Sequence, residues 1–246
     1  ISVLLAGFTG LFAKLISLNE VVIVWYRMLF AFLMYIGILF FVNKKPYEKI
    51  NQALKICGLG ILLAIHLVFF FGSIKYSNVS VGAVCYSLVG FFTVFLEPLI
   101  LKKKFSYYEL ICSLVAVLGI GLIFGFSAEY RFGILLGIVS AFLFTFYTLF
   151  NKVTEVGKSS WTMLFYELLG GTVFMSIFLS VYNLYFPVSI VPVGSDLLWL
   201  IILALLCTVF LYLLHISVLK TLSAFTVSLA GNLEPVYGII FAVIFL

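Results

Sequence analysis

Apolar stretches of about twenty residues follow one another along almost the whole chain, and they constrain its fold more than any other feature. A helix of about 20 apolar residues is long enough to cross the hydrocarbon core of a bilayer. Of the 246 residues, 65% are hydrophobic and 9% are charged, whereas a soluble domain usually carries about 25% charged residues. The sequence therefore predicts an all-α membrane protein, because the short alternating segments of a transmembrane barrel do not occur.

Nine spans are expected from the apolar runs. They cover residues 1–18, 21–43, 54–74, 78–101, 107–126, 132–152, 159–184, 196–219 and 222–246. Gly and Pro within them do not argue against helices, because neighbouring helices can satisfy the freed backbone groups. Both termini lie inside apolar runs, so we expect the sequence to be trimmed at both ends, with a tenth helix beyond Leu246.

Basic residues gather in alternate loops, which predicts the orientation of the chain. With a cytoplasmic N-terminus, ten lysines lie in inner loops and four basic residues lie on the outer side. The inner set is Lys44, Lys45, Lys49, Lys55, Lys102, Lys103, Lys104, Lys152, Lys158 and Lys220, and the outer set is Lys14, Arg27, Lys75 and Arg131. Such an excess is typical of cytoplasmic loops. We therefore expect an integral protein of a bacterial cytoplasmic (inner) membrane, and the net charge of +5 needs no nucleic-acid partner.

Motifs of enzymes, metal sites and nucleotide-binding loops do not occur in the sequence. Cys57, Cys85, Cys112 and Cys207 are scattered singly through apolar spans, without metal-ligand spacing. There is no GxxxxGK(S/T), HExxH or GxSxG, and Asp196 is the only aspartate. The sequence therefore predicts no catalytic residue, no metal site, no cofactor and no direct coupling to ATP.

Ordered similarities between the two halves of the chain indicate an internal repeat. The matched pairs are LFAK (11–14) and LFNK (149–152), WYRML (25–29) and FYELL (165–169), Lys75 and Lys220, and Gly90 and Pro235. We predict one five-helix repeat at 1–126, a linker at 127–131, and a second repeat at 132–246 that lacks its fifth helix. An odd number of spans per copy inverts the second copy in the membrane, which is a recurrent architecture of secondary transporters.

Three segments carry a resemblance to a known family. They are GSIKYSNVSVGAV (72–84), FFTVFLEPLILKKKFS (91–106) and VSLAGNLEPVYGIIFAVIFL (227–246). With these segments the chain resembles the EamA-type transporters of the drug/metabolite transporter superfamily. The resemblance implies a ten-helix bundle of two inverted five-helix repeats, and a substrate among amino acids and their derivatives. One departure is Gly90, where the fourth span of the family often has proline; here Pro98 follows, next to Glu97.

Glu234 is the most unusual residue of the last apolar run, because it places a carboxyl close to the middle of the membrane. A charge at that depth costs about 2.5–3.5 kcal/mol on insertion scales. Pro235 removes the amide that would bond the carbonyl of Gly231, so that carbonyl, the Asn232 amide and the carboxyl form a polar cluster. We expect Glu234 and Asn232 to bind substrate or protons, with Pro235, Gly231 and Gly90 as hinge positions. The alternative is a static, hydrogen-bonded carboxyl.

Arg27 and Glu167 occupy matching places in the two halves, at opposite depths in the membrane. We expect both to lie on one substrate or proton pathway without pairing directly. The alternatives are an Arg27 that extends outward to the interface and a Glu167 without cavity exposure.

Two histidines, two tyrosines and a further carboxyl also lie within the apolar spans. His66, in the middle of its span, is expected either to relay protons or to donate to a backbone carbonyl as a core residue. Tyr86 and Tyr166 lie deep and are expected to line a cavity. His215 and Glu97 are expected near inner span ends, close to water.

The function predicted from the sequence is secondary active transport of a small polar metabolite, an amino acid or derivative, with efflux coupled to protons by alternating access. The expected partners are a small-molecule substrate and the lipid bilayer. The small-residue spacings GILLG (133–137) and GLIFG (121–125) are typical of close helix contacts and leave a homodimer open. Alternatives are a non-transporting membrane scaffold or sensor and, least favoured, an intramembrane enzyme.

Overall fold

The computed structural model describes residues 2–124, 130–234 and 236–237, and every regular element within these ranges is a helix. The helices are α1 (Ser2–Leu15), α2 (Glu20–Phe41), α3 (Ile50–Lys75), α4 (Val79–Tyr86), α5 (Leu88–Leu101), α6 (Tyr107–Phe124), α7 (Arg131–Thr154), α8 (Ser160–Tyr185), α9 (Asp196–Ala204), a π-helical turn (Leu205–Phe210), α10 (Leu211–Leu219) and α11 (Ala224–Gly231). The all-α fold class predicted from the sequence is therefore confirmed for the described residues.

Six segments of the described chain are long and apolar enough to cross a membrane. They are Glu20–Phe41, Ile50–Lys75, Val79–Leu101, Arg131–Thr154, Ser160–Tyr185 and Asp196–Leu219. Each coincides with one of the nine spans expected from the sequence, and the ends differ by at most four residues. α1 is shorter, with 14 residues. The protein is an integral membrane protein built from apolar helices.

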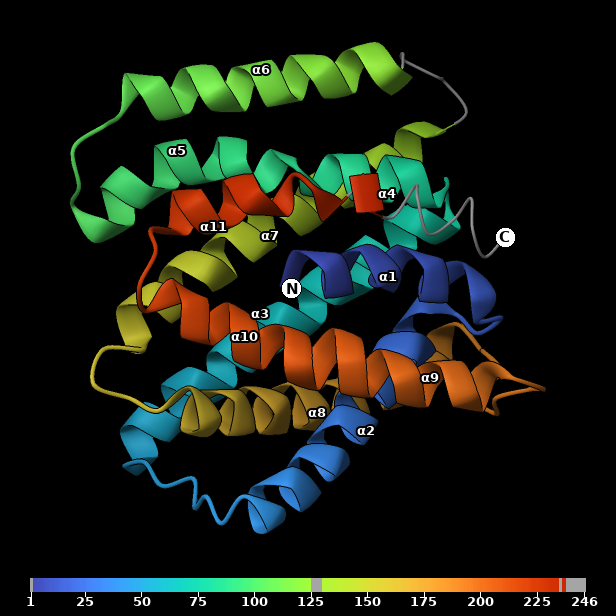
Figure 1. Ribbon diagram of the computed structural model, residues 1–246. Coiled ribbons are helices and arrows are strands. Elements are labelled where there is room, and N and C mark those ends of the chain that lie inside the picture. The colour runs from blue at the N-terminus through green and yellow to red at the C-terminus, as the bar shows by residue number, and fades with distance from the viewer. Residues whose placement is uncertain (1, 125–129, 235, 238–246) are drawn as a thin grey trace.

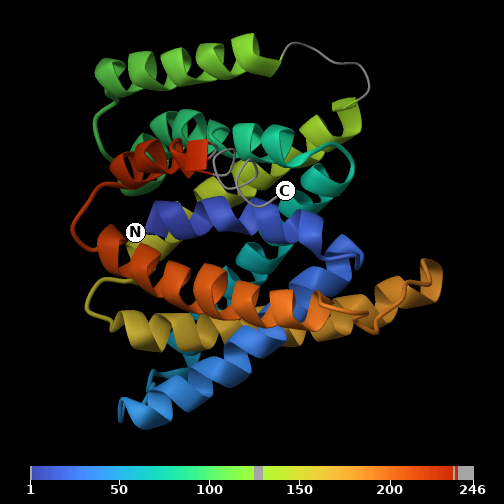
Figure 2. The ribbon, with the colours of Figure 1, turned by 45° about the vertical axis from the view of Figure 1, so that its right-hand side comes forward.

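The helices run between two opposite ends of the bundle, where their turns gather (Figure 1). One end, which we call the basic end because most of the lysines lie there, carries the turns at 42–49, 102–106, 155–159 and 220–223. The opposite end carries the turns at 16–19, 76–78 and 186–195. α3 packs against both α7 and α8, and α2 packs on α8 and α9. α6 lies at the edge of the bundle beside α5 (Figures 1 and 2).

α3 and α8 approach each other backbone to backbone. A Cβ atom added at Gly60 would lie 1.9 Å from the carbonyl oxygen of Glu167, and one added at Gly170 would lie 2.3 Å from that of Cys57. Small residues allow such contacts in membranes, where van der Waals packing rather than the hydrophobic effect drives helix association. This contact fixes the position of Glu167 against α3.

The spacing GILLG (133–137) also serves packing within the chain. A Cβ atom at Gly133 would lie 2.7 Å from the side chain of Ser77, and one at Gly137 would lie 2.5 Å from that of Cys85. Both glycines of this motif therefore face α3, α4 and the turn between them. The motif gives no support to a homodimer.

Two short helices, α4 and α11, have the same length and the same kind of start. Each has eight residues. The Asn78 side chain accepts a hydrogen bond from Val81 N at 2.9 Å, and the Ser223 hydroxyl accepts one from Thr226 N at 3.0 Å. Such N-caps satisfy an amide that has no partner within the helix. Each position of α4 that is compared here lies 145 residues before its counterpart in α11, namely the capping residue, the residue whose amide it accepts from, and both helix ends. Lys75 and Lys220 have the same separation.

The last apolar run is interrupted earlier than the sequence suggests. α11 ends at Gly231, and the amides of Asn232 and Leu233 each donate to the carbonyl three residues back, at 3.1 and 3.2 Å. The expected span 222–246 is therefore interrupted at Asn232 and Leu233, because Gly and Asn readily end a helix, and helical backbone resumes at Glu234. Pro235 lies outside the described residues. The span 78–101 is likewise divided at Ser87, between α4 and α5.

Candidate functional site

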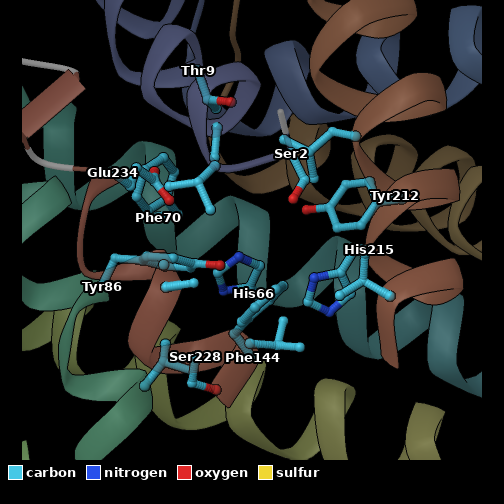
Figure 3. Close-up of a pocket in the computed structure, with 18 of the residues that line it drawn as sticks. Ser2, Thr9, His66, Phe70, Tyr86, Phe144, Tyr212, His215, Ser228 and Glu234 are labelled. Atoms are coloured by element: carbon cyan, nitrogen blue, oxygen red, sulfur yellow. The ribbon is translucent and has the colours of Figure 1, made fainter. Parts of the chain in front are cut away.

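A cavity of about 110 Å³ lies inside the bundle. Its polar lining consists of Ser2, Thr9, Arg27, His66, Tyr86, Tyr212, His215, Ser228 and Glu234. Figure 3 shows Glu234 and Tyr86 on one side of the cavity and Tyr212 and His215 on the other, with His66 between them. Internal spaces that combine apolar walls with a few convergent polar groups are typical of small-molecule sites.

His66 is held by Ser140 of α7. Its Nδ1 lies 2.9 Å from both the backbone oxygen and the hydroxyl oxygen of Ser140, and that hydroxyl also lies 3.3 Å from the carbonyl oxygen of His66. A carbonyl only accepts, so its contact with Nδ1 favours the neutral tautomer that has its proton on Nδ1 and an acceptor at Nε2. The ring packs on Phe144 at 4.7 Å and on Tyr86 at 6.0 Å. His66 thus has the carbonyl bond expected of a core histidine and also lines the cavity.

α10 supplies two further side chains to the cavity, His215 and Tyr212, and the second of these was not predicted from the sequence. His215 is buried, and its Nε2 has no hydrogen-bond partner among the described residues. It lines the cavity and packs against Tyr147, with ring centroids 6.1 Å apart, and its expected closeness to water stays a prediction. Tyr212 lies one helical turn earlier on the same face. That spacing of three residues was the available signal for Tyr212.

Glu234 lies beyond the end of α11, buried and facing the cavity (Figure 3). Within the described part of the chain, no cation lies within ion-pair distance of its carboxyl. Arg27 is close enough for its charge to act on the Glu234 carboxyl. The structure therefore places a carboxyl and a guanidinium on one internal space.

Arg27 does not extend outward to the interface, since its side chain is only 1% exposed. Its Nε donates to the Thr208 hydroxyl at 2.7 Å, and its Nη2 donates to the carbonyl of Cys207. The guanidinium also lies over the rings of Phe71 and Tyr212, at 5.7 and 6.0 Å. Its Nη1 has no hydrogen-bond partner among the described residues. One nitrogen of the Arg27 guanidinium is therefore a hydrogen-bond donor without an acceptor among the described residues.

Glu167 is buried away from the cavity. The Tyr147 hydroxyl donates to one carboxyl oxygen at 2.8 Å, and the Asn151 amide donates to the other at 2.7 Å. The side chain is fully buried and does not contribute to the cavity lining. The favoured expectation of cavity exposure is wrong, because α8 turns this residue towards α3 and α7. No ion pair joins it to Arg27 in the described structure.

The remaining predicted positions lie around the cavity or outside it. Tyr166 packs on Phe165 and does not line the cavity. Gly231 lines it, whereas Asn232 lies beside it, with its amide nitrogen 3.8 Å from where a Cβ of Gly90 would be. Among the described residues, no three His, Cys, Asp or Glu side chains are placed to share a metal ion.

At the end opposite the basic end, hydrogen bonds link parts of the chain that are far apart in the sequence. The backbone N and the hydroxyl of Ser17 both donate to the Asp196 carboxylate, at 3.0 and 2.6 Å. Lys75 Nζ donates to the carbonyl of Ile16 at 2.7 Å. These contacts tie the α1–α2 turn to the start of α9 and the end of α3.

The turns of the basic end are tied together by lysines. Lys152 Nζ donates to the carbonyl of Leu222 at 2.9 Å and lies 3.6 Å from the Glu155 carboxylate. Lys220 Nζ donates to the carbonyl of Lys158 at 2.8 Å. Burial raises the pKa of the Glu155 carboxyl, and the charge of Lys152 opposes this shift. The α10–α11 turn is thus fastened to the α7–α8 turn.

Glu97 fastens α5 to α11 at the basic end. It is buried, forms an ion pair with Lys103 at 2.5 Å, and accepts a hydrogen bond from Phe225 N at 3.1 Å. Glu97 thus lies near the end of its span, as expected, beside the exposed Lys103, and its carboxyl is buried because the first turn of α11 uses it as an acceptor. Val218 and Leu222, which line the cavity, lie at the same end.

The bundle of apolar helices, with polar and charged side chains lining a cavity between them, defines the class of polytopic helical membrane proteins. The sequence profile of the EamA-like transporter family matches residues 1–125 and 131–246. The chain belongs to this family.

Two individual proteins are similar to the chain. A protein of Haemophilus influenzae described as an uncharacterized transporter is 27% identical over 145 residues, which cover 55% of this chain and 47% of that protein. The match thus spans about half the length of this curated relative. A solved crystal structure with 15% sequence identity has a TM-score of 0.78 and covers 99% of this chain and 85% of the other. At that identity the likeness concerns the fold alone.

Proposed function

We propose that the protein is a secondary active transporter that moves a small polar metabolite through the central cavity by alternating access. The observation that carries this proposal is the pair of oppositely charged groups, Arg27 and Glu234, which are buried and line one cavity. Ionisable side chains at membrane depth are costly and mark substrate or ion pathways. The family resemblance favours an amino acid or amino-acid derivative as substrate, moved outward.

The architecture proposed for this function is a ten-helix bundle of two inverted repeats, 1–126 and 132–246, joined by 127–131. The matching starts and lengths of α4 and α11 support it, as does the family match to residues 1–125 and 131–246. Lys75 and Lys220 add a further match, because each donates to a carbonyl in a turn, and the two turns lie at opposite ends. Inverted copies require this change of end.

Hydrogen bonds tie the turns at both ends of the bundle, at Ser17–Asp196 on one side and at Lys152–Leu222 on the other. The cavity lining includes Val218 and Leu222, which lie near the basic end. We assign the basic end and the N-terminus to the cytoplasm of a bacterial cell, following the positive-inside rule. We propose that the cavity opens to the cytoplasm at Val218 and Leu222, and to the outside when the Ser17–Asp196 bonds part.

Glu234 is the proposed proton-binding group. Its carboxyl faces the cavity and has no close cation, so a proton and the ammonium group of a substrate are alternative partners for it. The titratable or charged side chains that share the cavity with it are Arg27, His66, Tyr86, Tyr212 and His215. A single carboxyl that binds either a proton or a substrate cation couples their movements in opposite directions.

Transport by purified protein in proteoliposomes tests the proposal. Uptake of each labelled L-amino acid is measured with and without a pH gradient, for the unaltered protein, Glu234→Gln and the control Glu48→Gln in the 42–49 turn. We expect Glu234→Gln to lose gradient-driven accumulation while keeping exchange at equal pH. Full gradient-driven transport by a folded Glu234→Gln protein would end the proton role. Absence of any transport by the unaltered protein would favour a membrane scaffold or sensor instead.

A further inference from the structure

The backbone between α9 and α10 is not α-helical. Residues Leu205–Phe210 form a π-helical turn inside the span Asp196–Leu219. In such a turn the hydrogen bonds run over five residues instead of four, and these turns are frequent at functional sites. The Thr208 hydroxyl donates to the carbonyl of Leu203, five residues earlier, at 3.2 Å. The carbonyl of Cys207, within the same turn, accepts from Arg27.

Thr208 is oriented by these bonds, and it orients Arg27 in turn. A hydroxyl has one proton to donate and two lone pairs with which to accept. Its proton goes to Leu203, so a lone pair accepts the Nε proton of Arg27 at 2.7 Å. Together with the carbonyl of Cys207, this bond fixes the plane of the guanidinium at two of its three nitrogens.

The third nitrogen, Nη1, is buried without a partner in the described structure. Arg27 lines the cavity, and no carboxylate of the described chain lies within ion-pair distance of it. Burying a charged donor without a partner is costly, and the guanidinium fork matches a carboxylate or phosphate well. An anionic group on a ligand in the cavity would satisfy this donor.

We infer that the π-helical turn and Thr208 position Arg27 so that its Nη1 binds the carboxylate of the transported molecule. This inference deepens the proposed function and rests on it for the identity of the ligand as a transported molecule. Arg27 contacts the ligand, and Thr208 acts as a positioning residue through Arg27. A zwitterion would then place its carboxylate at Arg27 and its cationic end at Glu234, both of which line the cavity.

Arginine side-chain NMR tests the inference without any transport measurement. The chain has only two arginines, Arg27 and Arg131, so protein labelled with ¹⁵N-arginine gives two Nε–H signals, one of which is an internal control. Sodium acetate is titrated in as a minimal carboxylate, inorganic phosphate as the competing anion, and methylammonium chloride as a cation control. We expect acetate to shift the Arg27 signal to saturation and to leave the Arg131 signal in place.

Variants of Thr208 separate positioning from mere folding. Thr208→Val and Thr208→Ala remove the acceptor and should weaken acetate binding at Arg27 about tenfold, whereas Thr208→Ser should stay within about twofold. Unchanged affinity in a folded Thr208→Val protein would refute the positioning role. If both hydroxyl-free variants fail to fold, the acetate titration of the unaltered protein still decides the anion site.

The remaining outcomes are equally decisive. An Arg27 signal that responds to neither anion would overturn the inference even if amino-acid transport is observed. A response to phosphate but not to acetate would refute the carboxylate and indicate a phosphorylated ligand. Acetate binding at Arg27 without any transport would instead leave the site standing and refute the proposed function.

Discussion

Arg27 in α2 and Glu167 in α8 occupy matching places in the proposed repeat, and both are buried inside a membrane protein, yet they have different surroundings. Both carboxyl oxygens of Glu167 accept hydrogen bonds, from Tyr147 and Asn151. Arg27 keeps one nitrogen without a partner and lines the cavity. Depth in the membrane alone therefore does not show whether the fold supplies all hydrogen-bond partners of a buried charged group or leaves one for a ligand.

The difference arises from what each residue packs against. Glu167 lies where α8 meets α3 backbone to backbone at Gly60, so no space for a ligand remains beside it. Arg27 lies opposite the π-helical turn, whose Cys207 carbonyl and Thr208 hydroxyl accept hydrogen bonds from it. A close helix contact thus excludes a site on one side of the bundle, and a local irregularity creates one on the other.

The largest effect is expected for Arg27→Gln. Loss of the guanidinium removes the donor for the substrate and leaves Thr208 and Cys207 without their charged partner, so transport below saturation should fall about 100-fold. Initial rates in proteoliposomes measure this change. Arg131→Gln, at the start of α7, is the matched control and should transport normally. Equal rates for the two variants would remove Arg27 from the transport pathway.

The next effect concerns the helix contact beside Glu167. Gly60→Ala places a methyl group 1.9 Å from a backbone oxygen, so α3 and α8 must separate, at a cost of about 3 kcal/mol in unfolding free energy. Gly58→Ala, two residues earlier on the same helix, meets no atom within 4 Å and should be neutral or slightly stabilising. Denaturant titration in detergent compares them. Similar stabilities would contradict the close contact.

Tyr147→Phe probes the hydrogen bonds that satisfy Glu167. Removing the hydroxyl leaves one carboxyl oxygen without its donor and should lower the unfolding free energy by about 1.5 kcal/mol. Transport rates should change little, since Tyr147 does not line the cavity. Tyr185→Phe, at the exposed end of α8, is the control and should match the unaltered protein in stability. A transport defect without a stability defect would point to a proton path through Tyr147.

The smallest effect is expected for Glu167→Gln. Glutamine keeps the size of the side chain and one acceptor oxygen, and its NH2 group can donate to the Tyr147 hydroxyl, so transport should stay within about threefold of the unaltered rate. The pH dependence of initial rates is the measurement, with Glu234→Gln as the contrasting variant. A collapse of gradient-driven transport in Glu167→Gln would restore this residue to the proton pathway expected from the sequence.

The spans of the long helices could be predicted from the sequence, because apolar length is set by membrane thickness. The predicted span 196–219 coincides with Asp196–Leu219. Hydrophobicity carries no information on backbone irregularity within a span, so the π-helical turn at Leu205–Phe210 was not predicted. Thr208 lies in this turn and accepts a hydrogen bond from Arg27, so this contact was not predicted either.

The cavity could be predicted only in part. Arg27, His66, Tyr86 and Glu234, which were expected on a substrate or proton pathway, line it, and so does the expected hinge position Gly231. Tyr166 and Glu167 were assigned to the pathway by depth but do not line the cavity, because depth fixes a position along the membrane normal and leaves the direction around the helix axis open. For the same reason Tyr212 was not predicted.

The backbone contact at Gly60 and Gly170 joins a helix of the first proposed repeat to a helix of the second. Two helices that touch through their main chains have no side chains between them to yield when one slides past the other. They can still tilt about the line of contact. We therefore expect α3 and α8 to act as the fulcrum of the transport cycle, with the Ser17–Asp196 end and the basic end swinging apart in alternation around a line that stays fixed.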